Sequence, residues 1–311
     1  MNIFIAGATG AVGRALIPQL IEHGHTVTGT TRSPDKADAL RALGATPVVV
    51  DGLDREAVMN AIKAVEPEAV VHQMTALAGL SDPRKFEQSF AMTNRLRTEG
   101  TDNLLAAAAE VGATLVAQSY AGWPYEPVGG AVKDEDAPLM SNPPKQMRAT
   151  LDAIRHVERV VPAAGGTVLR YGGFYGPGTG IARGGEQWDA VHARKFPIVG
   201  DGGGMWSFCH IGDAASAAVV ALERPAPGAI LNVCDDEPAP VRDWLPALAQ
   251  DIGAKPPRHV PRWVGRLLGA HVVQMMCEAR GASNARAKDV LGWQPSVKSW
   301  REGFAQLSTV S

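Results

Sequence analysis

The sequence predicts an α/β fold, a doubly wound parallel sheet followed by a smaller C-terminal substrate lobe. Two observations favour this fold class. Short runs of apolar and β-branched residues alternate with longer helical patterns through the first half of the chain, which is typical of a parallel sheet with right-handed crossovers. The glycine-rich stretch GATGAVG, residues 7–13, stands between the first expected strand and the first expected helix, where a nucleotide-binding turn belongs.

Each expected element follows from its own pattern. The strands are short and nearly continuous in apolar residues, as strands covered on both faces should be; they span residues 2–6, 26–31, 46–50, 68–74, 114–119 and 167–173. The helices carry apolar residues at helical spacing; they span residues 12–23, 35–43, 54–65, 84–111 and 145–162. The segment between Ser119 and the last of these helices is rich in Pro and Gly, and we interpret it as a long functional loop.

The pattern is more broken after about residue 174. Glycine-rich turns occur at GPGTG and GDGGG, and we expect helices near 212–223 and 241–253 and a strand at AILNV. We therefore predict a nucleotide-binding Rossmann domain over residues 1–173. Residues 174–311 are expected to form mainly the substrate-binding lobe, packed on the carboxyl edge of the sheet.

The composition excludes several classes of protein. The 311 residues are 45% hydrophobic, enough to bury a core. A formal net charge of -2 offers no broad basic surface for nucleic acid, and no apolar run reaches the ~18 residues of a bilayer span. Three distant cysteines and the absence of a basic leader suggest a reducing compartment. We expect a cytoplasmic protein with a small-molecule partner, no metal site, and neither nucleic acid nor membrane as partner.

The glycine-rich turn predicts a site for a dinucleotide pyrophosphate. Glycine lets the backbone approach the phosphates closely, and the first turn of the following helix offers unpaired N–H groups and a positive dipole. The predicted contacts are Gly7, Thr9, Gly10, Ala11, Val12 and Gly13.

The end of the second strand favours NADP(H) over NAD(H). Sites for NAD(H) commonly place Asp or Glu about 20 residues after the glycines, but this chain has Arg32 there, with Lys36 nearby. A guanidinium suits a 2′-phosphate, and the lysine adds a second charge. Ser33 is a further candidate contact, although it also fits the N-cap of the next helix.

Topology predicts further cofactor contacts after the third and fourth strands, because ligands bind outside the carboxyl ends of parallel strands. The candidates are Asp51, Gly52, Leu53, Gln73, Met74 and Thr75. Each of them also fits an ordinary loop or core position.

Several motifs, taken in order, resemble the extended short-chain dehydrogenase/reductase superfamily in its NAD-dependent epimerase/dehydratase branch. They are GATGAVG, TNRLRTEGTDNLLAAAAEVG, Ser119 at the end of the fifth strand, LRYGGFYGPG and FCHIGDAASAAVVAL, and they cover nearly the whole chain. The resemblance implies hydride transfer between a nicotinamide and a carbonyl carbon.

The helix at 145–162 lacks the acid/base pair that this resemblance implies. In that family a tyrosine, with a lysine four residues later, exchanges a proton with the substrate. Counting back from Glu158 places Thr150 and Ile154 at these two positions, and none of the 4 tyrosines has a lysine four residues later. The chain therefore resembles an atypical member of the family.

Other side chains are candidates for the missing proton donor. Tyr120 is the first, Tyr171 and Tyr175 are alternatives, and Ser119 is expected to assist and to contact the cofactor. Lys145 and Arg148 could stabilise an oxyanion or bind an anionic substrate. Each has a structural alternative, as an aromatic wall for the tyrosines and as a solvated helix start for the two cations.

Aromatic side chains in the irregular segments are predicted to wall the substrate cleft, although core packing explains several equally well. They are Trp123, Tyr125, Phe174, Trp188 and Trp206. They favour an apolar or aromatic ligand over a sugar nucleotide.

Two hypotheses about function follow. The first is an NADPH-dependent reductase of a small ketone, enone or imine, and the second is a catalytically silent NADP(H)-binding sensor. Sugar-nucleotide epimerisation is a distant third. A homodimer through the helices at 84–111 and 145–162 is a further expectation.

Overall fold

The computed structural model describes residues 1–77 and 82–307. Its centre is a seven-stranded sheet in the order β12-β7-β5-β4-β1-β2-β3, with every neighbouring pair parallel. The strands are β1 (Asn2–Ala6), β2 (Thr26–Thr31), β3 (Thr46–Val49), β4 (Ala69–His72), β5 (Thr114–Tyr120), β7 (Thr167–Tyr171) and β12 (Ile230–Val233). The strand order reverses between β1 and β4, which makes their carboxyl ends the switch point where ligands bind.

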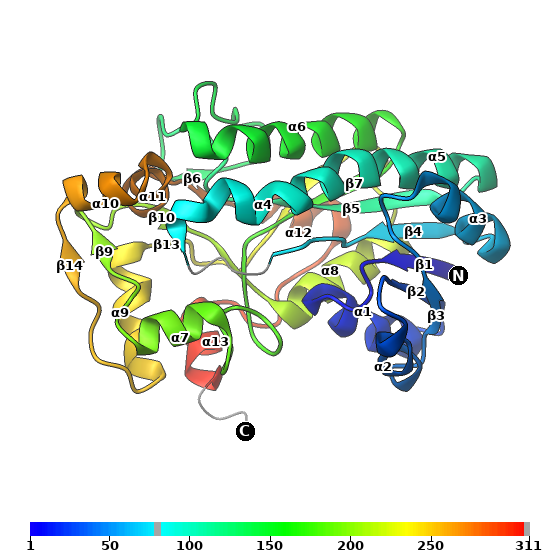
Figure 1. Cartoon of the computed structure of the whole chain (residues 1–311), viewed down its shortest axis with the longest axis horizontal. Coiled ribbons are helices and arrows are strands. Elements are labelled where there is room, and N and C mark those ends of the chain that lie inside the picture. Colours follow the sequence, from blue (N-terminus) through cyan, green and yellow to red (C-terminus); the bar gives the residue numbers. More distant parts are fainter. Residues whose placement is uncertain (78–81, 308–311) are drawn as a thin grey trace.

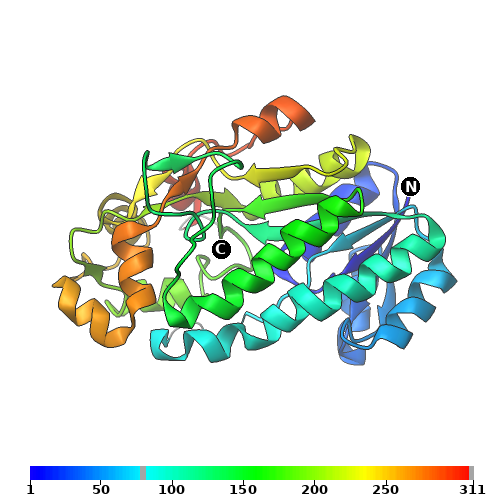
Figure 2. The same ribbon diagram turned by 90° about the horizontal axis from the view of Figure 1, so that it is seen from above.

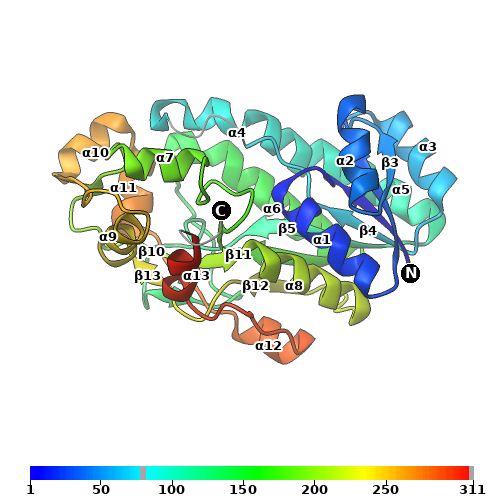
Figure 3. The same ribbon diagram turned by 90° about the horizontal axis from the view of Figure 1, so that it is seen from below.

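Helices cover both faces of the sheet, because successive residues of each buried strand point to opposite sides. Ile3 and Ile5 pack toward α1 (Ala11–Glu22) and α8 (Ile211–Glu223), which lie against each other in Figure 3. Phe4 packs on the other face, toward α3 (Arg55–Val65), α5 (Thr101–Val111) and α6 (Arg148–Ala163). Figure 2 shows α6 in green, running diagonally across this second face.

The predicted α/β fold is confirmed, and the bounds of β1 and β2 are those expected from the sequence. The helix expected at 84–111 is divided. It comprises a 3-10 turn (Pro83–Lys85), α4 (Phe86–Arg95), a π-helical turn (Leu96–Gly100) and α5. The helix expected at 35–43 is a 3-10 turn (Pro34–Lys36) followed by α2 (Ala37–Ala42).

The segment after residue 173 returns to the sheet before it completes the lobe. The strand expected at AILNV is β12, the seventh strand of the central sheet, and α8 packs on α1. Both elements therefore lie in the layers of the sheet, and the division of the chain at residue 173 stays a prediction.

The lobe gathers at the end of the molecule opposite the N-terminus (Figure 1). Its own core includes Trp244, Trp300 and Phe304. The helices are α7 (Glu186–His192), α9 (Val241–Asp251), α10 (Arg262–Leu268), α11 (Ala270–Val273), a π-helical turn (Gln274–Glu278), α12 (Ala285–Leu291) and α13 (Trp300–Leu307). Paired short strands connect them: β6 (Val132–Lys133) with β15 (Gly281–Ala282), β8 (Gly173–Tyr175) with β11 (Phe208–His210), β9 (Ile198–Val199) with β14 (His259–Val260), and β10 (Met205–Trp206) with β13 (Ala239–Pro240). Throughout residues 1–77 and 82–307, no helix is both long and apolar enough to cross a bilayer.

Candidate active site

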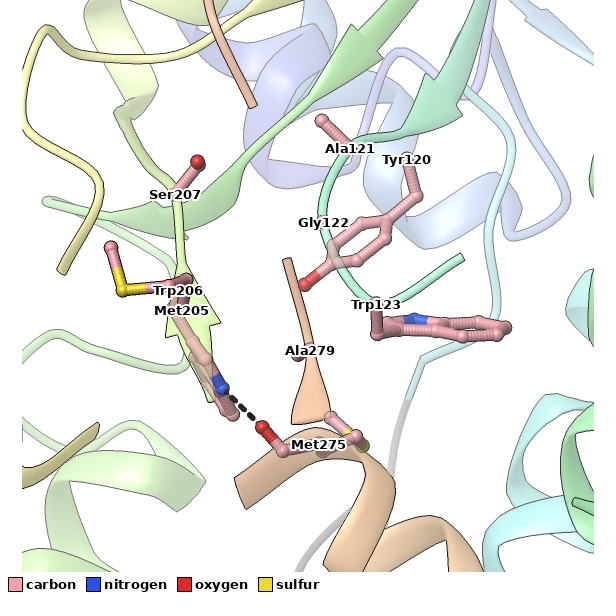
Figure 4. A pocket seen from close by; sticks show the side chains of 9 residues that line it. All are labelled: Tyr120, Ala121, Gly122, Trp123, Met205, Trp206, Ser207, Met275 and Ala279. Carbon is pink, nitrogen blue, oxygen red and sulfur yellow. Dashed lines mark hydrogen bonds between the residues drawn. The ribbon is translucent and has the colours of Figure 1, made fainter. Parts of the chain in front are cut away.

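A small pocket opens beside the carboxyl end of β5, where that strand meets the lobe. Its lining comes from the turn after β5, from β10 and from the π-helical turn at 274–278 (Figure 4). The lining residues are Tyr120, Ala121, Gly122, Trp123, Met205, Trp206, Ser207, Met275 and Ala279. Apolar and aromatic groups dominate this lining, and the pocket is smaller than the roughly 300–1,000 Å³ of a typical ligand site.

Tyr120 points its hydroxyl into this pocket, and its ring lies 6.3 Å from that of Trp123, centroid to centroid. Among the described residues the hydroxyl has no hydrogen-bond partner. Burial raises the pKa of Tyr120 to about 12, because a buried phenolate loses its hydration, while the nearby Arg97 guanidinium opposes that rise. At neutral pH the side chain is therefore a protonated phenol, able to donate a hydrogen bond.

Ser119 does not line this pocket, and its expected roles as an assisting group and a cofactor contact stay predictions. Its hydroxyl donates to Glu158 Oε1 at 2.7 Å, and Arg170 donates to both oxygens of the same carboxylate at 2.7 Å. Ser119 and Arg170 are neighbours in the sheet register, and Glu158 reaches them from α6. Sequence reasoning could not foresee this network, because its three members come from different elements.

The alternative tyrosines are core residues. Tyr171 is 1% exposed, accepts a hydrogen bond from Gln73 Nε2 at 3.4 Å, and has a pKa raised by burial. Tyr175 packs edge-on against Phe304 in the lobe core, and burial raises its pKa too. Lys145 is exposed in the 3-10 turn before α6 (Lys145–Met147), and Arg148 is exposed at the start of α6. Neither residue lines the pocket. Of the predicted proton donors, only Tyr120 reaches the pocket.

Two of the predicted wall residues, Trp123 and Trp206, line the pocket. The Trp206 indole N–H donates to the Met275 carbonyl at 2.9 Å, which fixes its ring as one wall (Figure 4). The π-helical turn that carries Met275 was not expected from the sequence.

The other three predicted wall residues lie elsewhere. The Tyr125 hydroxyl donates to Asn232 Oδ1 on β12 at 2.7 Å, so this ring anchors the long loop to the sheet. Phe174 packs against Tyr171 at 5.3 Å between centroids, and Trp188 is buried in α7. These three rings pack in or against the hydrophobic core. The sequence left core packing open as an alternative to a place in the cleft wall.

Arg97 is a charged residue near this site that sequence reasoning missed. It lies in the π-helical turn at 96–100, is 6% exposed, and interacts electrostatically with Tyr120. The available signal was its spacing, because Thr93, Arg97 and Gly100 all fall on the buried face of this helical segment. A cation on such a face calls for an explanation.

The glycine-rich turn is shaped as a dinucleotide cradle. Gly7 has φ +92°, and a Cβ there would lie 2.6 Å from the Gln73 carbonyl carbon. A Cβ at Gly13 would lie 2.5 Å from the Ala8 oxygen, so only glycine lets α1 pack this close to the turn. Helix α1 begins at Ala11, directly after Gly10. The N–H groups of its first turn are left for an anion.

A second depression adjoins this cradle. Thr9, Arg14 and Lys36 line it with apolar residues of α2 and the turn after it. Arg32 is exposed at the end of β2, and Ser33 makes no side-chain capping bond to the turn that follows. Arg14 was not foreseen, because the motif assigns no contact to the residue after its last glycine.

The remaining predicted cofactor contacts lie after β3 and β4. Asp51 is exposed and accepts the Leu53 N–H at 3.0 Å, which also makes it a turn residue. Gln73 and Met74 are buried, and Thr75 is exposed. Gly52 packs against Met74, since a Cβ there would lie 2.2 Å from its sulfur. These residues sit where the topology places them, and their contacts with a cofactor stay a prediction.

The sequence of this chain is similar to those of known proteins. Residues 3–234 match the model of the NAD dependent epimerase/dehydratase family. The chain is 47% identical over 312 aligned residues to a 3-diazoavenalumate denitrifying reductase of a Streptomyces species, covering 98% of this chain and 100% of the relative.

More distant relatives agree with this likeness. A 4-hydroxy-2-methyl-3-oxo-4-farnesyl-3,4-dihydroquinoline-1-oxide ketoreductase of Stigmatella aurantiaca is 27% identical, covering 82% of this chain and 74% of the relative. A UDP-glucose 4-epimerase of Thermotoga maritima has the same fold, with a TM-score of 0.76 at 20% identity, covering 99% of this chain and 98% of that one. The chain belongs to the NAD dependent epimerase/dehydratase family and is an NAD(P)-binding oxidoreductase of the extended short-chain dehydrogenase/reductase type.

Proposed function

We propose that the cofactor is NADP(H), held by the glycine cradle and by a basic depression beside it. The residues fit such a group, because the cradle has no room for a Cβ at Gly7 or Gly13. Arg14 and Lys36 line one depression with Thr9, and Arg32 is exposed at the end of the adjoining strand. Cations at this place would bind a 2′-phosphate.

The proposed reaction is the reductive removal of a diazo group from a small aromatic acid. The observation that carries it is the 47% identity, over the whole length of both chains, to a reductase that is named for a diazo substrate. The pocket supports an aromatic substrate, since Trp123, Trp206 and Tyr120 offer rings to a flat ligand.

The atoms and charges of this reaction balance without a proton from the protein. When bound, the nicotinamide would supply a hydride, whose electron pair ends in the C–H bond that replaces the C–N bond of an aryl diazonium, while both nitrogens leave as N2. The pocket would hold the ring. A tyrosine–lysine pair is dispensable for such a substrate, and this chain has none.

An assay of two products tests the proposal. The purified chain is mixed with NADPH and 3-diazoavenalumate, and N2 release and NADPH oxidation are followed together. We expect one N2 for each NADPH, faster than in a control without protein. NADPH consumption without N2, or a rate equal to that control, would remove the support for this reaction.

Carbonyl reduction is a second candidate, favoured by the Tyr120 hydroxyl that points into the pocket. A ketone needs a proton on its oxygen as well as a hydride, and a protonated phenol can supply it. A panel of aryl ketones with NADPH tests this candidate, and turnover of a ketone without any N2 release from the diazo compound would favour it.

We also propose that two copies associate through the outer faces of α4, α5 and α6, which lie side by side (Figure 2). Light scattering of the purified chain tests this dimer.

A further inference from the structure

Arg97 is a buried cation. Its side chain is 6% exposed, and its Nε has no hydrogen-bond partner among the described residues. Within the part of the chain that is described, no carboxylate forms an ion pair with it. Burying an unpaired charge is costly, and burial lowers the pKa of Arg97 to about 10. The guanidinium remains charged at neutral pH. Its charge therefore acts on the titratable groups around it.

The charged and titratable neighbours of Arg97 lie on three elements. Glu158 on α6 interacts electrostatically with Arg97, but both of its oxygens accept from Arg170 and one also accepts from Ser119. His72 ends β4, and burial lowers its pKa to about 4. His72 Nδ1 accepts the Met74 N–H, so Nε2 donates to the Leu96 carbonyl and the ring is neutral. The third neighbour is Tyr120, at the end of β5.

The geometry joins Arg97 to the pocket. The bond between His72 and Leu96, 3.1 Å long, fixes the π-helical turn over the end of β4, and the same turn packs on α6. Strand β5 is the next strand of the sheet, and its last residue is Tyr120. The Tyr120 hydroxyl faces the pocket and has no partner among the described residues (Figure 4).

We propose that Arg97 is a positioning residue whose buried charge stabilises the phenolate of Tyr120, so that this phenol exchanges protons with a ligand in the pocket. The phenol O–H bond breaks as its proton passes to a basic oxygen or nitrogen of the ligand. The negative charge left on the tyrosine oxygen is balanced by the guanidinium, and water entering the open pocket returns the proton. This inference rests on the proposed function only in taking the pocket as the substrate site.

Ionisation of Tyr120 can be measured without any turnover. The chain is labelled with 3-fluorotyrosine, and the 19F signals of its 4 tyrosines are followed against pH, with Tyr120→Phe identifying the signal of interest. We expect Arg97→Met to raise the pKa of Tyr120 by about one unit or more, since a buried charge that interacts with a phenol can have an effect of that size. Arg97→Lys should keep the pKa close to that of the unaltered chain.

Arg95→Met is the matched control. Arg95 precedes the same π-helical turn, but it is exposed and paired with Glu99 at 2.8 Å, so its loss should leave the Tyr120 pKa unchanged. An unchanged pKa in folded Arg97→Met, or an equal rise in Arg95→Met, would overturn the proposal.

A measurement on the unaltered arginine covers the case in which Arg97→Met fails to fold. With 15N-labelled arginine, the Arg97 Nε signal should shift as Tyr120 ionises, and this shift should vanish in Tyr120→Phe. A signal that ignores the ionisation of Tyr120 contradicts the proposal. Failure of the diazo assay alone leaves both results intact, so the two proposals fail separately.

Discussion

Tyr120 is the one titratable side chain among the nine residues that line the pocket. Its pKa of about 12 results from burial, opposed by Arg97. A phenol with this pKa is a hydrogen-bond donor across the physiological range, and it gives up its proton only to a strongly basic atom such as a developing alkoxide. The chemistry of the site at residue scale therefore depends on which atom of the substrate faces this hydroxyl.

Replacement of Tyr120 by phenylalanine separates the two candidate reactions. For Tyr120→Phe we expect carbonyl reduction to fall by roughly 10² to 10⁴-fold, the usual contribution of a general acid. The kcat/KM for diazo reduction should change by less than about tenfold, the contribution of one hydrogen bond, because that reaction needs no proton from the protein. The measurement is kcat/KM for both substrates with NADPH. An equal loss for both would show that the phenol acts in the same way in each reaction.

Asp235, at the end of β12, makes stability depend on pH. It is 2% exposed, and burial raises its pKa from 3.8 to about 8. Because the folded pKa exceeds the unfolded one, the stabilisation is complete below pH 4 and is lost as pH rises toward 8. In Asp235→Asn we expect the decline in Tm between pH 5 and 8 to be smaller than in the unaltered chain. At pH 8 the variant should gain at least about 1 kcal/mol, and a decline of equal size in both chains would exclude Asp235 as its source.

At the scale of elements, the strands and crossover helices could be predicted from the sequence because each has a periodic pattern of its own. The two π-helical turns, at 96–100 and 274–278, could not. A π-helical turn is usually a single turn within a helical segment, too short to give a periodic pattern of its own. Arg97 and Met275 lie in these two turns. Their place near the pocket therefore depends on π-helical turns, which no local sequence pattern predicts.

The packing of α1 on the glycine turn predicts a specific weakness at Gly13. For Gly13→Ala we expect a loss of roughly 1–3 kcal/mol in the free energy of unfolding, as overpacking typically costs, because the new Cβ would lie 2.5 Å from the Ala8 oxygen. Affinity for NADPH should fall at the same time, since the first turn of α1 must move. Gly130→Ala is the control, since a Cβ there would meet its nearest neighbour at 3.8 Å. Urea unfolding and NADPH titration measure both effects, and equal results for the two variants would contradict this account of the turn.

At the scale of the whole molecule, the sheet and the cofactor cradle follow from the sequence, whereas the substrate pocket follows only in part. Tyr120 directly follows a predicted strand and Trp123 lies in the loop after it, so their place near the edge could be foreseen. Tyr125 is just as near in sequence, yet it bonds to Asn232, 107 residues away. Contacts over such separations decide which aromatic rings wall the pocket and which fill the core. No local pattern encodes them.

Charge at the cofactor site predicts a preference for NADPH. The double variant Arg14→Ala and Lys36→Ala should raise the Kd for NADPH by more than about tenfold, since a charge-assisted hydrogen bond contributes about 1.5–3 kcal/mol. The Kd for NADH should change little. Arg41→Ala is the control, since Arg41 is exposed on α2 and already paired with Asp38. Calorimetric titration measures the Kd of both cofactors. Equal losses of affinity for NADPH and NADH would argue against a 2′-phosphate site.

The proposed reaction transfers a hydride from NADPH to the ring carbon of an aromatic substrate that carries the diazo group. NADPH deuterated at nicotinamide C4 tests this transfer, with mass spectrometry and NMR of the product formed from 3-diazoavenalumate. We predict one deuterium at the ring carbon that carried nitrogen, from only one of the two C4 epimers of the cofactor. A product with solvent hydrogen at that carbon, or equal transfer from both epimers, would contradict direct hydride transfer in this site.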